Sequence, residues 1–338
     1  MQNYKWFMGI DVSKAKLDVT LLEGSSKVLY HLIGNDLKGL EGLIKRLESV
    51  EGFSWKECLV CAEHTGIYNA HLLTIAQKHS WSLCLESGVQ IKLSGGLQRG
   101  KNDIVDSYRI ALYAFKNVTE LKLWQPCRSV LTALQKLSGL RCRLINAKKQ
   151  LATALQEDKG FIDKQLLKIM ERCNRRSIKA LDKDIKLTDE KIVAVIESDE
   201  ELKKLFAIVE SVPGIGTVTA VEIIITTNEF KHIKDPRKYA CYSGVAPFEH
   251  TSGSSIRGRT RTSKKANQYV KSILHMGSLR VIRCCPDMKQ YYDRKVAEGK
   301  HKMAVLNAVK NKMIHRVFAC VNRNEPYQIN YNNRWVLS

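Results

Sequence analysis

Four carboxylates have the residue type and the placement for phosphoryl-transfer chemistry. Asp11 and Glu63 each end an apolar, strand-like run, in MGIDVSK and LVCAEHTG. Asp103 and Asp106 lie three apart in KNDIVDSYRIALYAF, so at helical spacing they share nearly one face, away from the apolar stripe. Carboxylates at strand ends can converge from distant positions, and Mg²⁺ or Mn²⁺ take such oxygen ligands. The quartet predicts a two-metal catalytic site.

A glycine-rich turn is the second feature. The run Val212-Pro213-Gly214-Ile215-Gly216 enters the helical sequence TVTAVEIII. Backbone N–H groups of a Gly-x-Gly turn at a helix start can approach a phosphate closely. We therefore expect Gly214 and Gly216 to bind nucleic-acid backbone in a helix-hairpin-helix-like motif; the alternative is a purely structural turn.

A hydroxyl-rich loop followed by a cationic block is the third feature. Ser252 lies in His250-Thr251-Ser252-Gly253-Ser254-Ser255, and no acidic residue occurs between Glu249 and Asp287. Basic residues inside that stretch include Arg257, Arg259, Arg261, Lys264, Lys265 and Lys271. A serine beside guanidinium groups that bind phosphate is a reasonable phosphoryl nucleophile. We expect the first five cations to contact nucleic acid, while the alternative for the loop is an ordinary surface connection.

Composition favours a polyanionic partner. The chain carries 55 Lys and Arg against 34 Asp and Glu, a formal net charge of +21, and neutralising phosphates releases condensed counterions. A basic surface without a specific partner is the alternative. No apolar run reaches the roughly 18 residues of a membrane helix, and Asp11 interrupts the short apolar run near the N-terminus, unlike a secretion signal. Scattered cysteines indicate a reducing cytoplasm, and we expect Cys58 and Cys61 to be buried strand residues rather than zinc ligands.

The elements that must position these residues have a recognisable order. We expect two strands within residues 5–22, a third at 27–33, a helix at 36–48, a strand at 58–63, a helix at 68–79, a strand at 82–87 and a helix at about 103–115. This succession is that of an α/β RNase H-like (RuvC-like) domain, which we place at residues 1–125.

The sequence changes character after Trp124-Gln125-Pro126. Residues 126–208 are highly charged with helical periodicity, which predicts a long antiparallel hairpin or coiled coil, with an ordinary helical bundle as the alternative. A third, mainly α-helical domain is expected at 209–325, followed by a tail at 326–338.

These motifs together resemble the DEDD transposases, namely the insertion-sequence family one-ten recombinases and the Piv and MooV DNA invertases. GIDVSK, AEHTG and KNDIVDSYRIA resemble the family's N-terminal acidic motifs. SVPGIGTVTA, YSGVAP, HTSG, SKKANQYVKSIL and GKHKMAVLNAVKNKM resemble its C-terminal transposase domain, in order.

The resemblance implies roles for individual residues. The family's metal-binding quartet falls on Asp11, Glu63, Asp103 and Asp106. Its Ser-Ser-Gly motif reads Thr251-Ser252-Gly253 here, which makes Ser252 the expected nucleophile, with Ser254 and Ser255 as other registers.

The resemblance also implies a mechanism and partners. Family members cut and rejoin donor and target DNA through a covalent phosphoserine link, and insertion-sequence members use a structured non-coding guide RNA. We expect a homo-oligomer, a dimer or a dimer of dimers, acting at the nucleoid of a bacterium or archaeon and not at a membrane. Two alternatives stay open: a Holliday-junction resolvase-like or RNase H-like nuclease using metal-activated water, and a catalytically decayed nucleic-acid-binding protein.

Overall fold

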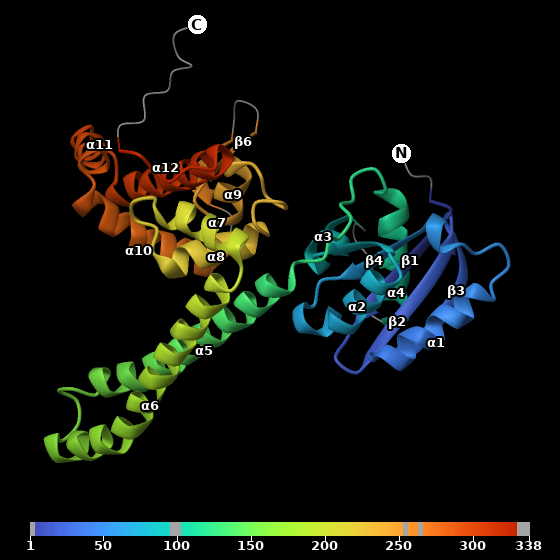
Figure 1. The fold of residues 1–338 in the computed structure, drawn as a ribbon, viewed down its shortest axis with the longest axis horizontal. Coiled ribbons are helices and arrows are strands. Elements are labelled where there is room, and N and C mark those ends of the chain that lie inside the picture. The colour runs from blue at the N-terminus through green and yellow to red at the C-terminus, as the bar shows by residue number, and fades with distance from the viewer. Residues whose placement is uncertain (1–3, 95–102, 253–255, 263–265, 330–338) are drawn as a thin grey trace, which may run out of the picture. The chain divides into compact units, whose positions relative to one another are not determined.

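The chain folds into two compact units, Met1–Pro126 and Cys127–Ser338 (Figure 1). The computed structural model describes residues 4–94, 103–252, 256–262 and 266–329, without the side chains of Asp103, 248–252 and 256–261. The three-domain division expected from the sequence is finer than these two units and stays a prediction.

The first unit is a mixed five-stranded sheet with helices on both faces. Its elements are β1 (Trp6–Val12), β2 (Lys16–Glu23), β3 (Ser26–Gly34), α1 (Leu37–Glu48), β4 (Cys58–Glu63), α2 (Ala70–Lys78), β5 (Ser82–Glu86), α3 (Gly88–Ser94) and α4 (Asp103–Lys116), with short 3₁₀ turns at Trp55–Glu57 and Gly66–Asn69. The strand order is β3-β2-β1-β4-β5, with β1 antiparallel to β2 and parallel to β4. This arrangement confirms the expected strands and is compatible with an RNase H-like fold; only the short helix α3 was not expected.

Side-chain alternation divides the sheet into two faces. Trp6, Met8 and Ile10 of β1 pack in a cluster with α1 and α2. Phe7, with Cys61 of β4, packs in another cluster with α3 and α4. Since successive strand residues point to opposite faces, odd-numbered residues of β1 and β4 face α4. Cys58 and Cys61 are both buried, free thiols, as expected.

The second unit is mostly helical. It contains α5 (Ser129–Glu157), α6 (Lys164–Glu197), α7 (Glu200–Glu210), α8 (Thr217–Thr227), α9 (Pro236–Tyr242), β6 (Pro247–Ser252), β7 (Ile256–Thr262), α10 (Gln268–Cys284), α11 (Pro286–Ala297) and α12 (Lys302–Arg323). Within the described ranges, no helix has the length and apolar character needed to cross a membrane.

Helices α5 and α6 lie alongside each other in antiparallel directions (Figure 1). Arg141 Nε lies 2.5 Å from Asp189 Oδ1, and Lys148 Nζ lies 2.6 Å from Asp182 Oδ1, so later residues of α5 meet earlier residues of α6. The predicted antiparallel helix pair is therefore present, while coiled-coil interlocking of its side chains stays a prediction.

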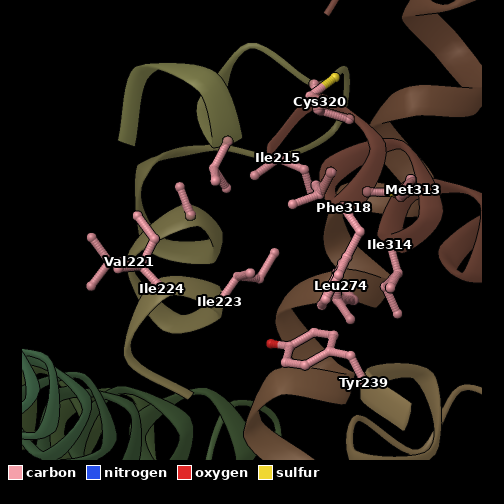
Figure 2. Packing of buried hydrophobic residues seen from close by; sticks show 14 of the residues in the cluster. Ile215, Val221, Ile223, Ile224, Tyr239, Leu274, Met313, Ile314, Phe318 and Cys320 are labelled. Atoms are coloured by element: carbon pink, nitrogen blue, oxygen red, sulfur yellow. The ribbon is translucent and has the colours of Figure 1, made fainter. Parts of the chain in front are cut away.

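The core of the second unit lies between α8, α10 and α12. Figure 2 shows Ile223 and Ile224 of α8 on one side, with Leu274 of α10 and Met313 and Phe318 of α12 on the other. All five side chains are buried. This packing holds α10 and α12 side by side, close to the β6–β7 hairpin that precedes α10 in the chain.

Candidate active site

Asp11 and Glu63 occupy the same end of two adjacent parallel strands. The last β1–β4 pair in register is Ile10 with Ala62, so Asp11 and Glu63 are the next residues along their strands. Both have the odd parity that faces α4, and both are half-buried. The β1–β4 pairing thus brings together two carboxylates that are far apart in the sequence.

Helix α4 runs antiparallel to β1. The ring of Phe115, near the end of α4, lies 5.2 Å from that of Phe7, near the start of β1. Further along β1, a Cβ on Gly9 would lie 2.2 Å from the backbone oxygen of Ser107 and from the backbone nitrogen of Ala111. The first turn of α4 therefore lies toward the Asp11 end of β1, and Gly9 permits the close approach.

That first turn carries the other two predicted carboxylates. The Oγ atoms of Ser107 and Thr20 lie 2.8 Å apart in a buried hydrogen bond, which ties α4 to β2. Asp106, immediately before Ser107, accepts a hydrogen bond from Arg109 Nη1 at 3.0 Å. The backbone of Asp103 begins the helix, and its side chain is outside the described part. The structure thus brings the backbones of all four predicted carboxylates to one end of the sheet.

The segment after Glu63 is held by a buried asparagine. The Nδ2 of Asn69 donates to the backbone oxygen of Glu63 at 2.9 Å, and its Oδ1 accepts from the backbone nitrogen of Thr65 at 2.7 Å. A Cβ on Gly88 would lie 2.0 Å from Glu63 Oε1, so the carboxylate packs against the start of α3. Both contacts fix the position of the Glu63 carboxylate at the end of β4.

Two further acids, missed by sequence reasoning, extend the row. Asp18 of β2 pairs in register with Asp11, and Glu86 of β5 pairs with Glu63. Thr20 and Cys84 lie two residues from Asp18 and Glu86 on the same strands. Thr20 hydrogen-bonds to Ser107 of α4, and Cys84 packs in the cluster that contains α4, so Asp18 and Glu86 face α4 as well. A row of four carboxylates therefore crosses β2, β1, β4 and β5. The sequence signal was the same as for Glu63, because Glu86 also ends its strand.

The two flanking acids differ in environment. Asp18 is buried, accepts a hydrogen bond from the Tyr30 hydroxyl at 2.6 Å, and has Lys16 Nζ 3.5 Å from its carboxylate. Burial raises the pKa of Glu86, opposed in part by a hydrogen bond from the Ser87 backbone and by the charge of Lys122. Each flanking acid thus has a lysine charge nearby, and burial disfavours the charged form of Glu86.

The donor set suits a hard divalent cation in kind, since carboxylate oxygens are the ligands of Mg²⁺ and Mn²⁺. Among the side chains in the described ranges, however, no three carboxylates, imidazoles or thiols are close enough together to hold a metal ion. The undescribed Asp103 side chain belongs to the predicted quartet. The fit therefore rests on residue type and on the shared end of the sheet.

The glycine-rich turn joins α7 to α8 in the second unit. Gly214 has φ +87°, and a Cβ there would lie 2.9 Å from the backbone oxygen of Gly277 in α10. Gly216 is the N-cap of α8 and has open space around it. Gly214 thus serves the close packing of the turn on α10, and phosphate binding by either glycine stays a prediction. A groove of about 560 Å³ runs along this turn, with Arg280 in its lining.

Ser252 is the last residue of β6. It pairs with Ile256 of β7, so it lies at the tip of the β6–β7 hairpin. Arg257, Arg259 and Arg261 are all on β7; Lys264 and Lys265 lie outside the described residues. The hairpin and the carboxylate row belong to different compact units.

Comparisons with known proteins identify the family. A transposase model of the DEDD IS110 type matches residues 8–157, and the model of the IS116/IS110/IS902 transposase family matches residues 207–293. The chain is 23% identical over 333 residues to the pilin gene-inverting protein of Moraxella lacunata, covering 96% of this chain and 98% of that protein. It is 25% identical over 235 residues to a putative transposase of Sinorhizobium fredii, covering 61% and 59% of the two chains. It is also 24% identical over 145 residues to the transposase of insertion sequence element IS1111A of Coxiella burnetii, covering 41% and 38%. Because its N-terminal and C-terminal parts both match models of these transposases, the chain is identified as a DNA transposase or recombinase similar to the DEDD transposases of the IS110 type.

Proposed function

We propose that this transposase cuts and rejoins DNA through a covalent link between Ser252 and a DNA phosphate, with Mg²⁺ or Mn²⁺ held by Asp11, Glu63, Asp103 and Asp106. The observation that carries the proposal is that Asp11 and Glu63 follow the last paired residues of the adjacent strands β1 and β4, with the acidic first turn of α4 toward the same end. A divalent cation bound there would stabilise the charge that develops on the phosphate oxygens.

The serine step conserves the phosphodiester bond energy. Ser252 Oγ forms a bond to phosphorus, the bond from phosphorus to the oxygen of the departing strand breaks, and the serine proton ends on that oxygen. In rejoining, the hydroxyl of the incoming strand attacks the phosphoserine and Ser252 regains a proton. No external energy source is required, which suits a reaction that must cut and reseal.

The second unit would supply most DNA contacts. We propose that α7, the Gly214–Gly216 turn and α8 act as a helix-hairpin-helix motif that contacts backbone without reading sequence. Arg257, Arg259, Arg261, Lys264 and Lys265 would neutralise further phosphates. Their support is the unbroken absence of acids between Glu249 and Asp287.

We also propose a structured non-coding guide RNA and a homo-oligomer, acting at the bacterial or archaeal nucleoid. The support is the net charge of +21, which favours polyanionic partners, and the resemblance to insertion-sequence recombinases. Recombination by protein freed of RNA, with and without RNA transcribed from the gene's flanks, tests the guide. Equal recombination with and without this RNA would refute the need for a guide RNA.

The function is tested with full-length protein on plasmids carrying the element ends. Wild-type protein with Mg²⁺ should leave a protein–DNA adduct in denaturing gels, and Ser252→Ala should abolish it. Adduct in Ser252→Ala would move the nucleophile to Ser254 or Ser255, and cleavage without any adduct would favour metal-activated water.

The metal site is tested by Asp11→Asn, which should abolish cleavage while leaving DNA binding nearly intact. The matched control is Glu23→Gln, which removes the same charge from the same sheet. Glu23 pairs with Trp6 at the far end of β1 and is exposed. Full activity in Asp11→Asn, or in excess EDTA, would refute the metal assignment.

A further inference from the structure

A lysine in α12 is buried without a partner of opposite charge among the described side chains. Lys310 is only 2% exposed. Within the described part of the chain, its ammonium makes neither a hydrogen bond nor an ion pair. A buried ammonium left unpaired is strongly unfavourable, so its burial requires either a partner or a use.

Two basic groups of α10 interact electrostatically with Lys310. Burial lowers the pKa of Lys310, and the like charge of Lys271 in α10 lowers it further. Burial, followed by the charge of Lys310, lowers the pKa of the imidazole of His275, which lies one turn further along α10. The Nδ1 of His275 is buried and makes no hydrogen bond in the described structure. Lys271 and His275 of α10 therefore both act electrostatically on Lys310 of α12, and no acid among the described side chains pairs with its ammonium.

The cluster lies beside the hairpin that carries Ser252. Lys271 Nζ donates to Thr262 Oγ1 at 3.0 Å, and Thr262 is the last residue of β7. The stem of Lys271 lies along Gly244, in the turn before β6, because a Cβ there would be 3.4 Å from Lys271 Cδ. The site therefore adjoins the segments that enter and leave the hairpin.

We propose that Lys310, Lys271 and His275 form a binding site for one backbone phosphate of DNA at the base of the β6–β7 hairpin. An anion supplies the charge that the buried ammonium lacks and accepts hydrogen bonds from all three side chains. The site fixes the position of the strand relative to Ser252, so these are positioning residues. The inference rests on the proposed function only in naming DNA as the source of the phosphate and Ser252 as the nearby nucleophile.

The first test uses inorganic phosphate as the probe on the full chain. Melting is followed by helical circular dichroism, which the second unit dominates, in phosphate and in chloride at equal ionic strength. A ligand that binds only the folded state raises the melting temperature. Phosphate should raise it for wild-type protein and for Lys312→Met, but not for Lys310→Met. Lys312 is an exposed lysine on the same helix, with its ammonium 4.6 Å from the Tyr291 ring.

The second test measures DNA. Lys310→Met should weaken binding of a short duplex about 10-fold at low salt, and reduce the salt slope by about 1. Lys271→Met should act in the same direction, and it keeps the test decisive if Lys310→Met fails to fold. A phosphate-dependent rise in melting temperature as large in Lys310→Met and Lys271→Met as in wild type would overturn the site. A shift in phosphate without any loss of duplex affinity would show that the site takes free phosphate and not DNA.

A failure of the proposed serine chemistry can be distinguished from a failure of the phosphate site. Ser252→Ala should keep the phosphate-dependent shift, because it leaves the cluster intact. If no serine adduct forms in wild-type protein but the shift still depends on Lys310, the nucleophile assignment falls and the phosphate site stands.

Discussion

Replacing Lys310 by methionine should stabilise the free protein. Burial and the like charge of Lys271 lower the pKa of Lys310 from 10.5 to about 8. One unit of pKa shift corresponds to about 1.4 kcal/mol, so the charged ammonium costs the folded state about 3 kcal/mol at neutral pH. Methionine fills a similar volume without a charge. We expect the free energy of unfolding of the second unit to rise by about 2–3 kcal/mol in Lys310→Met at pH 7.

The pH dependence of this gain has a definite sign. Between pH 8 and 10.5 the folded protein has released the Lys310 proton while the unfolded chain still binds it. Wild-type stability from this group therefore rises with pH across that window, and the full penalty is present below it. The difference between wild type and Lys310→Met should be largest below pH 8 and should nearly vanish by pH 10.5. Other groups that titrate there are common to both proteins and cancel.

Urea unfolding, free of phosphate and sulfate, measures the effect. Helical circular dichroism follows mainly the second unit, while four of the five tryptophans, Trp6, Trp55, Trp81 and Trp124, belong to the first. The Lys312→Met control should change stability little at any pH. A Lys310→Met protein less stable than wild type at pH 7, or a gain that does not vary with pH, would show that Lys310 has a structural partner and refute the reasoning.

Two smaller predictions concern the candidate site and the cationic block. Gly9→Ala should destabilise the first unit by roughly 1–3 kcal/mol or more in urea unfolding, because its Cβ would overlap backbone atoms of α4. Gly42→Ala, in open space on α1, should instead stabilise it by about 1 kcal/mol, and a gain at both positions would contradict the packing of α4 on β1. Arg257→Ala should weaken binding about equally across DNA sequences and lower the salt slope by about 1, whereas loss on one sequence alone would indicate base readout.

Sequence patterns predicted the first unit well because strand alternation is a local signal. The apolar run of β4 and the alternating residues of β2 locate their strands without reference to the rest of the chain. Asp11 and Glu63 were found because each ends such a run. Asp18 was missed because it lies inside β2, where only the pairing with β1 shows that it is opposite Asp11.

Helical spacing alone places Lys310 on the apolar side of α12, because it lies four residues after Leu306 and four before Ile314. The sequence does not show that the neighbouring helices cover its ammonium-bearing side chain instead of leaving it at the edge of that stripe. The packing of α10 on α12 covers Lys310 and leaves Lys312 exposed. Similarly, the glycine pattern identified the turn at Gly214, but only the structure shows that α10 requires that glycine. Tertiary packing decides both cases.

The last prediction concerns how the serine meets the carboxylates. The two belong to separate compact units, and α5 and α6, of 29 and 34 residues, follow the first unit in the chain. At 1.5 Å per residue these helices extend about 40 and 50 Å. Arms of that length can carry a second unit to a neighbouring subunit, so we expect a composite site, in which Ser252 of one subunit acts with Asp11, Glu63, Asp103 and Asp106 of another.

Mixing two inactive proteins tests this arrangement. Neither Ser252→Ala nor Asp11→Asn should recombine DNA alone, since each lacks one half of every site. In a mixed oligomer, some sites would combine an intact serine from the Asp11→Asn subunit with intact carboxylates from the Ser252→Ala subunit. Partial recombination and an adduct confined to the Asp11→Asn chain should therefore appear. If each chain closes its own site, every site in the mixture retains one defect, and the mixture should stay as inactive as its components even when both proteins co-assemble.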